Sequence, residues 1–282
     1  TRRHAMSQYD DMYSQLVNEV LRHGEKRITR NGSTRSLFGM SAVITTLKDG
    51  LFPILTSRKI FYKPVLGELA AFIRGAEKLS EFKALGCNYW DANAAAWPPN
   101  HGRTPKDAKV GKIYGAQWRK WGRTEKDQLA ELLQNLRNDP FSRRHLLTTY
   151  NPEELWLGCL PPCHVLAQFN VTNDGCLDCI VTMRSVDLIH GLPADVILYA
   201  SLLILISAHV GYKPGNLIFM MGDTHVYENH VAIWNERQNG AQTYDAPTWL
   251  LSEFSDVLKF VPDDLELIDY QHGEKIEYPF NV

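Results

Sequence analysis

The feature that most constrains the fold is a long apolar segment in the second half of the chain. From Ala194 to Val210 the residues are apolar on nearly every side of a helix. Such a helix has no face for water and belongs in the centre of a core. Its uncharged part, Val196–Ala208, is shorter than the roughly 18 residues of a membrane span. We therefore expect the rest of the 282-residue chain, 44% of which is hydrophobic, to pack around this helix.

Shorter elements flank this segment on both sides. Helices are predicted from apolar residues at helical spacing, and strands from runs of branched and aromatic residues between turn signals. The predicted helices are Tyr9–His23, Pro64–Arg74, one over Leu129–Leu136 that ends before Asp139, and His225–Glu236. The predicted strands are His145–Tyr150, Val165–Val171, Leu177–Arg184 and Leu217–Met221. Thr29–Phe38 is predicted as a turn and Ala92–Val110 as a surface loop.

These elements predict a single α+β domain over residues 6–282. No linker, repeat or low-complexity run divides the chain. We expect Thr1–Ala5 to be tag residues before a native start at Met6. The N-terminus is polar and basic and lacks the apolar segment of a signal peptide.

Charge and cysteine usage narrow the function further. A net charge of −2 gives no overall basic surface for nucleic acid, so an anionic ligand needs a local cluster of arginines. Five cysteines, an odd number in a large chain, argue against a disulfide scaffold and for a reducing, cytoplasmic compartment. Cys176 and Cys179 are spaced as in zinc and redox motifs. Because we predict them on a strand, pointing to opposite faces, we interpret them as structural thiols.

The segment Gly158-Cys-Leu-Pro-Pro-Cys-His164 predicts a positioned nucleophile. Two prolines fix the backbone just before Cys163, and a predicted strand follows. A thiol attacks as the thiolate, which nearby positive charge stabilises. Arg143, Arg144 and Arg184 are the candidates for that charge. The alternative is that Cys163 is only a small buried hydrophobic residue.

His225 and His230 do not predict a metal site. On the predicted helix they are five residues apart, which places them about 140° apart around its axis. We therefore expect no bound metal and interpret His225 as a hydrogen-bonding partner of a sugar hydroxyl or a backbone group.

Ten motifs in a fixed order give the strongest signal. They are Arg30-Asn-Gly-Ser33, Gly67-Glu-Leu69, Tyr89-Trp-Asp91, Ile113-Tyr-Gly-Ala-Gln-Trp-Arg119, Asp139-Pro-Phe-Ser-Arg-Arg144, Leu160-Pro-Pro-Cys-His164, Met183-Arg-Ser-Val-Asp187, Gly191-Leu-Pro-Ala-Asp195, Gly222-Asp-Thr-His-Val-Tyr-Glu-Asn-His230 and an apolar C-terminus ending at Val282. Over nearly its whole length the chain resembles the thymidylate synthase family. The resemblance implies that family's fold, a central mixed β-sheet packed by helices, and a homodimer joined sheet to sheet.

The resemblance also implies roles for the matched positions. Catalysis would involve Cys163 as the nucleophile that adds to C6 of a pyrimidine, with Glu68, Asp195 and Tyr114. The substrate, a pyrimidine nucleoside monophosphate, would be bound by Arg30, Arg143, Arg144, Arg184, Ser185, Asp195, His225 and Tyr227. The co-substrate 5,10-methylenetetrahydrofolate would contact Leu160, Trp90, Asp187 and Gly191. In this family the two adjacent arginines come from the partner subunit, so the active sites of the dimer are shared.

One position departs from the usual pattern of the family. Asp195 stands where the family has an asparagine that reads uracil. Cytosine presents an acceptor at N3 and a donor at N4, and a neutral carboxylic acid matches that pair. The departure resembles the deoxycytidylate hydroxymethylase branch, which implies that water adds to an exocyclic methylene at C5 of dCMP. His190, Gly67 and Asn93 are further departures, which we assign to the folate side, and His190 is expected either to hold a water or to be structural.

The sequence leaves three alternative functions open. They are hydroxymethylation of CMP, ordinary methylation of dUMP, and a non-catalytic nucleotide- or RNA-binding role. Asp195 argues against dUMP, and the intact set of Cys163, Glu68 and arginines argues against a non-catalytic role.

Overall fold

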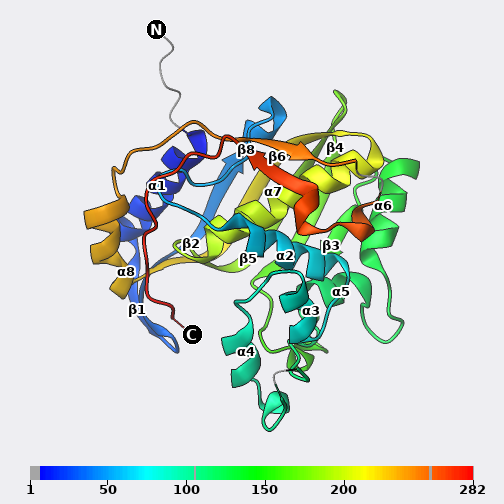
Figure 1. The fold of residues 1–282 in the computed structure, drawn as a ribbon, viewed down its shortest axis with the longest axis horizontal. Coiled ribbons are helices and arrows are strands. Elements are labelled where there is room, and N and C mark those ends of the chain that lie inside the picture. The colour runs from blue at the N-terminus through cyan, green and yellow to red at the C-terminus, as the bar shows by residue number, and fades with distance from the viewer. Residues whose placement is uncertain (1–6, 105, 254–255, 282) are drawn as a thin grey trace.

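The computed structural model describes residues 7–104, 106–253 and 256–281 (Figure 1). The expectations for Thr1–Ala5 and for the C-terminal Val282 lie outside these residues. At the centre is the helix α7 (Gly191–Val210), whose side chains are buried along nearly its whole length. In the described part of the chain, only this helix is long and apolar enough to cross a membrane, and 78% of its 18-residue apolar window is buried inside the protein. The predicted core helix is therefore confirmed.

A six-stranded sheet forms the other half of the core. Its order is β1-β2-β6-β5-β4-β3. The strands are β1 (Glu25–Thr29), β2 (Gly32–Ile44), β3 (Leu146–Thr148), β4 (His164–Val171), β5 (Cys176–Asp187) and β6 (Lys213–Tyr227). Only β5 and β6 pair in parallel, because α7 carries the chain from the end of one back to the start of the other. The sheet is therefore mixed, as predicted.

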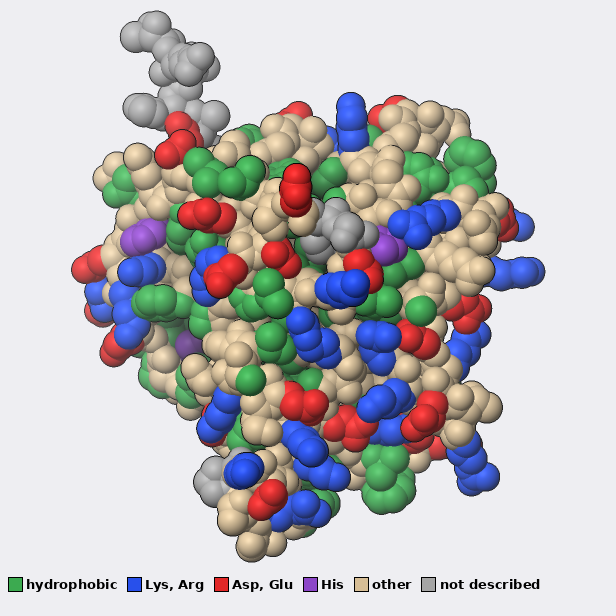
Figure 2. All heavy atoms as spheres, turned by 45° about the vertical axis from the view of Figure 1, so that its right-hand side comes forward, with side chains coloured by type: hydrophobic (Ala, Val, Ile, Leu, Met, Phe, Trp, Pro, Cys, Tyr) green, Lys and Arg blue, Asp and Glu red, His purple; other side chains and the backbone are tan. Residues whose placement is uncertain are grey.

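The remaining helices and a small second sheet lie around this pair of layers. In Figure 1, α7 and α2 cross in front of the sheet and cover one of its faces. The helices are α1 (Gln8–His23), α2 (Tyr62–Ile73), α3 (Leu79–Ala84), α4 (Asp91–Ala96), α5 (Tyr114–Arg119), α6 (Gln128–Asn138) and α8 (Glu228–Ile233). The second sheet pairs β7 (Thr248–Leu251) with β8 (Leu265–Ile268). On the surface seen in Figure 2, Lys and Arg side chains are interspersed with Asp and Glu.

The opposite face of the main sheet carries apolar side chains that are partly open to solvent. The strand registers place four apolar residues and the polar Gln168 side by side across five strands, in the order Leu146, Gln168, Ile180, Ile218 and Val43. Val43 is 52% exposed and Leu146 is 40% exposed. A row of apolar side chains of this kind is unusual on a surface that faces only water.

Several predicted boundaries were wrong. Thr29–Phe38 contains the turn at Arg30 and Asn31, but the rest of it is strand, the last residue of β1 and the first half of β2. The predicted helix His225–Glu236 begins too early, because β6 continues through Tyr227 and α8 starts at Glu228. The predicted loop Ala92–Val110 contains most of α4 and a short 3-10 helix at Pro98–Asn100.

The two cysteines of the C-x-x-C motif behave as interpreted. Cys176 is 7% exposed and Cys179 is 1% exposed, and both are free thiols on β5. Burial raises the pKa of the Cys179 thiol well above its usual range. Thiols of this kind contribute packing and are not reactive.

Candidate active site

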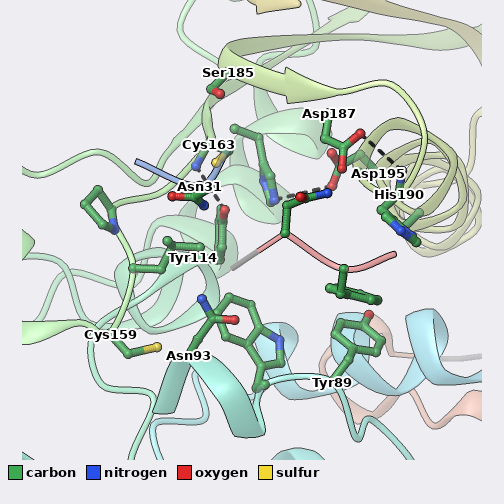
Figure 3. A pocket seen from close by; sticks show the side chains of 18 of the residues that line it. Asn31, Tyr89, Asn93, Tyr114, Cys159, Cys163, Ser185, Asp187, His190 and Asp195 are labelled. Carbon is green, nitrogen blue, oxygen red and sulfur yellow. Dashed lines mark hydrogen bonds and ion pairs between the residues drawn. The ribbon is translucent and has the colours of Figure 1, made fainter. Parts of the chain in front are cut away.

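One large cleft collects nearly all of the predicted site residues. It has a volume of about 1000 Å³ and opens beside the N-terminal end of α7 (Figure 3). The predicted residues that line it are Arg30, Glu68, Trp90, Tyr114, Leu160, Cys163, Arg184, Ser185, Asp187, Gly191, Asp195, His225 and Tyr227. Arg143 and Arg144 are not among them. They are exposed in the loop before β3.

Cys163 is held at the start of β4 by contacts on both sides. Its backbone N–H donates a hydrogen bond of 2.9 Å to the hydroxyl of Tyr114. Its sulfur lies 3.7 Å from Nη2 of Arg184. The Arg184 guanidinium is itself fixed, because it donates to the carbonyl oxygens of Pro161 and Pro162 at 2.8 and 2.7 Å. The two prolines therefore position both the thiol and the cation beside it.

Tyr114 adopts a strained backbone conformation to make its contact. Its φ of 28° lies in the left-handed region, which costs a non-glycine residue about 1–3 kcal/mol. Its ring stacks on His164 with the ring centres 3.9 Å apart and on Phe72 at 5.1 Å. These two stacks hold the ring in place and offset the strain.

The electrostatic environment of Cys163 differs from the one expected. Burial raises the pKa of the thiol, and of the charged groups only Arg184 lowers it, while Asp195 raises it. The pair Arg143–Arg144 was expected to add positive charge, and within one chain it does not reach the cleft. The single chain therefore supplies less stabilisation of the thiolate than the sequence suggested.

Glu68 lies on the buried side of α2 and faces the cleft. The Tyr89 hydroxyl donates to Oε2 and the Trp90 indole N–H donates to Oε1, both at 2.7 Å. Burial outweighs these two hydrogen bonds and raises the pKa of Glu68 to about 7. A carboxyl group with such a pKa can both give and take protons near neutral pH.

Trp90 and Gly67 have contacts that the sequence did not predict. Trp90 was assigned to the folate, and it also holds Glu68. Gly67 was grouped with the folate side, but it does not line the cleft. A Cβ at this position would lie 2.2 Å from the carbonyl oxygen of Leu85. Glycine is therefore required because the chain passes close to α2 here.

Asp195 lies one turn into α7 among other acidic groups. Burial raises its pKa well above the usual range, and the charges of Glu68 and Asp187 raise it further. Nε2 of His164 is 3.7 Å from Oδ1 of Asp195. Burial lowers the pKa of His164 to about 3, so this imidazole is neutral and does not favour the charged carboxylate. The surroundings therefore favour the neutral form of Asp195.

The side of the cleft assigned to folate contains polar contacts within the chain. Oδ1 of Asp187 accepts hydrogen bonds from the backbone N–H groups of Ile189 and His190 at 2.9 and 3.4 Å. A Cβ on Gly191 would meet only ordinary contacts, the nearest at 3.6 Å. Packing within the protein therefore does not require glycine at this position.

His190 is engaged by the C-terminal segment. Its Nε2 is 3.2 Å from the carbonyl oxygen of Pro279, and its ring stacks on Phe280 with the centres 4.5 Å apart. Of the two interpretations left open, the structural one agrees with these contacts. Phe280 and Asn281 also line the cleft, and no spacing in the sequence pointed to them.

The comparisons with known proteins agree with this arrangement. Residues 11–282 match the family described as Thymidylate synthase. The chain is 35% identical over 286 residues to the bifunctional dihydrofolate reductase-thymidylate synthase 2 of Arabidopsis thaliana, covering 96% of this chain and 50% of that relative. It is 37% identical over 242 residues to thymidylate synthase 1/2 of Encephalitozoon cuniculi (strain GB-M1), covering 81% of this chain and 80% of the relative.

A mixed α+β fold around a cleft with a positioned thiol agrees with the class of thymidylate synthase-like one-carbon transferases that the comparisons indicate. The chain belongs to the thymidylate synthase family. This family binds a pyrimidine nucleoside monophosphate and uses methylenetetrahydrofolate as co-substrate. The chain spans half the length of the bifunctional relative from Arabidopsis thaliana.

The raised pKa of Glu68 makes a prediction about stability. The pKa rises from 4.5 to about 7 on folding, so the folded state binds more protons and the free energy of unfolding falls as pH rises through this window. The difference is on the order of 3 kcal/mol. Glu68→Gln keeps the shape without the charge, so its stability relative to the parent should be greater at about pH 8 than at about pH 5. Urea unfolding at both pH values measures it.

The control is Glu236→Gln, at an exposed position of the same chain. It should change the free energy of unfolding equally at the two pH values. An equal effect of Glu68→Gln at both would show that burial does not raise this pKa.

Proposed function

We propose that this chain adds a one-carbon unit to C5 of a pyrimidine nucleoside monophosphate, with Cys163 as the nucleophile that attacks C6. The observation that carries the proposal is the contact of 3.7 Å between the Cys163 sulfur and Arg184, in a cleft that also contains Glu68. A thiol fixed beside a cation and opposite a carboxyl group with a pKa of about 7 has the parts needed for nucleophilic addition and proton transfer.

The residues would act in a defined order. Cys163 loses its proton and forms a bond to C6, and the electron pair of the C5–C6 double bond moves so that C5 becomes nucleophilic. After C5 has formed its bond to the one-carbon unit, C5 loses its hydrogen as a proton. Glu68, with water that it orients, takes up and returns protons at the base. Elimination of the Cys163 sulfur restores the C5–C6 double bond and frees the enzyme. Tyr114 holds the Cys163 backbone throughout.

The cleft has room for a second ligand beside the nucleotide. Its volume is about 1000 Å³, and the open position at Gly191 favours close approach of a flat ring. Trp90, Leu160 and Asp187 would complete this side. When bound, methylenetetrahydrofolate supplies the one-carbon unit and, in a methylation, the hydride that reduces it.

Two observations favour different bases. The relatives are named thymidylate synthases, which supports methylation of dUMP better than hydroxymethylation. Asp195 favours cytosine, because a buried neutral carboxyl group offers an O–H to N3 and a carbonyl oxygen to the N4 amine. We take hydroxymethylation of a cytosine nucleotide, dCMP before CMP, as the first candidate on the strength of Asp195, with dUMP methylation as the second. His190 is not assigned to a water, because it is already engaged.

Turnover tests the nucleophile and the product together. The protein is offered dCMP, CMP and dUMP with methylenetetrahydrofolate, and the nucleotide product is identified by mass while dihydrofolate is followed by absorbance. Cys163→Ala should lower the rate by at least about 1000-fold with little change in nucleotide binding. Cys159→Ala, which removes the other thiol that lines the cleft, is the matched control and should keep turnover. Dihydrofolate formed together with a methylated nucleotide would establish the second candidate.

Asp195→Asn tests how the base is read. An amide presents one donor and one acceptor, the pattern that uracil requires. The ratio of kcat/KM for dCMP to that for dUMP should fall by about 100-fold or more, because a mismatched buried polar pair is costly. An unchanged ratio would mean that this side chain does not read the base.

We also propose that two copies of a single domain over residues 6–282 form a homodimer through the exposed face of the sheet, in a reducing cytoplasmic compartment. The row that includes Val43 and Leu146 supports the choice of surface. The exposed positions of Arg143 and Arg144, outside their own cleft, agree with a role at the site of a partner. Two guanidinium groups there would bind the phosphate and stabilise the Cys163 thiolate.

Subunit exchange tests the shared site. Arg144→Ala and Cys163→Ala should each be inactive alone. A mixed dimer contains one site with neither defect, so an equal mixture should recover about a quarter of the parent activity. Arg22→Ala, at an exposed position on α1, is the control variant and should be active without being mixed. A mixed dimer shown by mass to form, but inactive, would assign each site to one chain.

A further inference from the structure

His225 lies on β6 with one ring nitrogen already engaged. Its Nδ1 is 3.0 Å from Oδ1 of Asp223, two residues earlier on the same strand. Ser36 donates from its hydroxyl to the same oxygen at 2.8 Å, and it lies directly opposite His225 across the β2–β6 pair. A carboxylate oxygen accepts hydrogen bonds, so the ring proton of a neutral His225 is on Nδ1.

The other oxygen of Asp223 joins this contact to the hairpin. Nη1 of Arg27, on β1, donates to Oδ2 at 3.2 Å. The turn between β1 and β2 carries Arg30 and Asn31, and both line the cleft. One carboxylate therefore connects the imidazole on β6 with the two strands of the hairpin that brings Arg30 to the cleft.

The other ring nitrogen of His225, Nε2, is available to a ligand in the cleft. His225 lines the cleft, its side chain is 12% exposed, and within the described residues Nε2 has no hydrogen-bond partner. With the proton on Nδ1, Nε2 is an acceptor. It can therefore pair only with a ligand group that donates a hydrogen bond, such as a sugar hydroxyl.

We infer that Asp223 is a positioning residue that fixes the tautomer of His225 and thereby makes the cleft select a nucleotide whose sugar 3′-hydroxyl donates to Nε2. The inference rests on the proposed function, in which His225 contacts the sugar. It assigns to Asp223 a role in specificity, and it explains why a carboxylate is placed between an imidazole and a guanidinium at this point of the sheet.

Asp223→Asn distinguishes a role in fixing the tautomer from a purely structural role. The new amide has a single oxygen, which can accept from only one of its two neighbours, His225 or Arg27, and Arg27 can only donate. The oxygen therefore turns to Arg27 and the NH₂ group to His225, which must then accept at Nδ1 and carry its proton on Nε2. The shape of the site is kept and its hydrogen-bond polarity is reversed, as happens when the aspartate of a catalytic triad is changed to asparagine.

The first measurement needs no substrate. Nitrogen-15 NMR of protein labelled at histidine identifies the protonated nitrogen, and the His225 signal is assigned by its loss in His225→Gln. The expected result is a proton on Nδ1 in the parent and on Nε2 in Asp223→Asn. Asp223→Ala, which removes the acceptor altogether, gives the same expectation if the asparagine variant does not fold. A proton on Nε2 in the parent, or an unchanged tautomer in both variants, overturns the inference whatever the protein catalyses.

The second measurement compares each nucleotide with its 3′-deoxy-3′-fluoro analogue of the same base, because the fluorine can accept a hydrogen bond but cannot donate one. In the parent, loss of the donor should lower kcat/KM by about tenfold or more, because the acceptor Nε2 is left unpaired. In Asp223→Asn, Nε2 carries the proton and donates, so the same replacement should cost less than about threefold. A parent that ignores the loss of the donor, or a variant that keeps the full ratio, overturns the inference.

A matched control comes from the same hairpin. Arg35 on β2 binds Glu228 on α8 through Nε at 2.8 Å, a pair of the same kind with no contact to His225. Glu228→Gln should leave both the tautomer and the 3′-hydroxyl ratio as in the parent. A parent that binds and converts no pyrimidine nucleotide would end the proposed function, while the NMR result would still decide the tautomer.

Discussion

The arrangement of the whole molecule depends on the burial of α7 against the neighbouring strands β5 and β6. This helix has no polar face, so it is stable only when other elements cover it on all sides. Its path also makes β5 and β6 parallel, and the end of β5 therefore lies beside the start of α7. That junction carries Asp187 and Asp195, so the same constraint that forms the core brings two carboxyl groups to the cleft.

The cleft has an unusual balance of charge for a site in which we propose that a thiolate forms. Glu68, Asp187 and Asp195 all face it, and Arg184 is the cation in contact with the Cys163 sulfur. Burial raises the pKa of Glu68, and burial together with the charges of Glu68 and Asp187 raises the pKa of Asp195. Protonation of two acidic groups reduces their opposition to the thiolate. Further positive charge from a partner subunit would act in the same direction.

Much of the site could be predicted from the sequence, because its residues occur in short motifs whose order is fixed. The core helix, the nucleophile and its proline platform needed only local information. Errors came where long-range pairing overrides local preference. The segment Thr29–Phe38 contains glycine, serine and arginine and looks like a turn, yet it becomes strand because β6 pairs with β2 along its length. For the same reason His225 was assigned to a helix and lies on β6.

Contacts between distant segments could not be predicted from patterns at all. Gly67 seemed to be a change at the ligand site, and its reason is the carbonyl oxygen of Leu85, 18 residues away, whose close passage only the folded chain reveals. The raised pKa of Glu68 likewise needed its depth of burial, which no motif states. Phe280 enters the cleft from the C-terminal segment by stacking on His190. Each of these features depends on residues that are close in space but that no repeating pattern in the sequence relates.

Similarity over the whole chain says little about which base is bound. The core, the proposed phosphate side and the proposed nucleophile would be the same whether the ring is uracil or cytosine. The choice between the two rests on the donor and acceptor pattern of one side chain, which is a very small part of an alignment. A carboxylate at position 195 would repel N3 of cytosine and accept from its amine, whereas the neutral acid matches both atoms. The relatives, 35% and 37% identical, are named thymidylate synthases, whereas the raised pKa of Asp195 bears on the base only through the contact that we propose for this side chain. A scaffold can be inherited unchanged while one side chain changes what it reads.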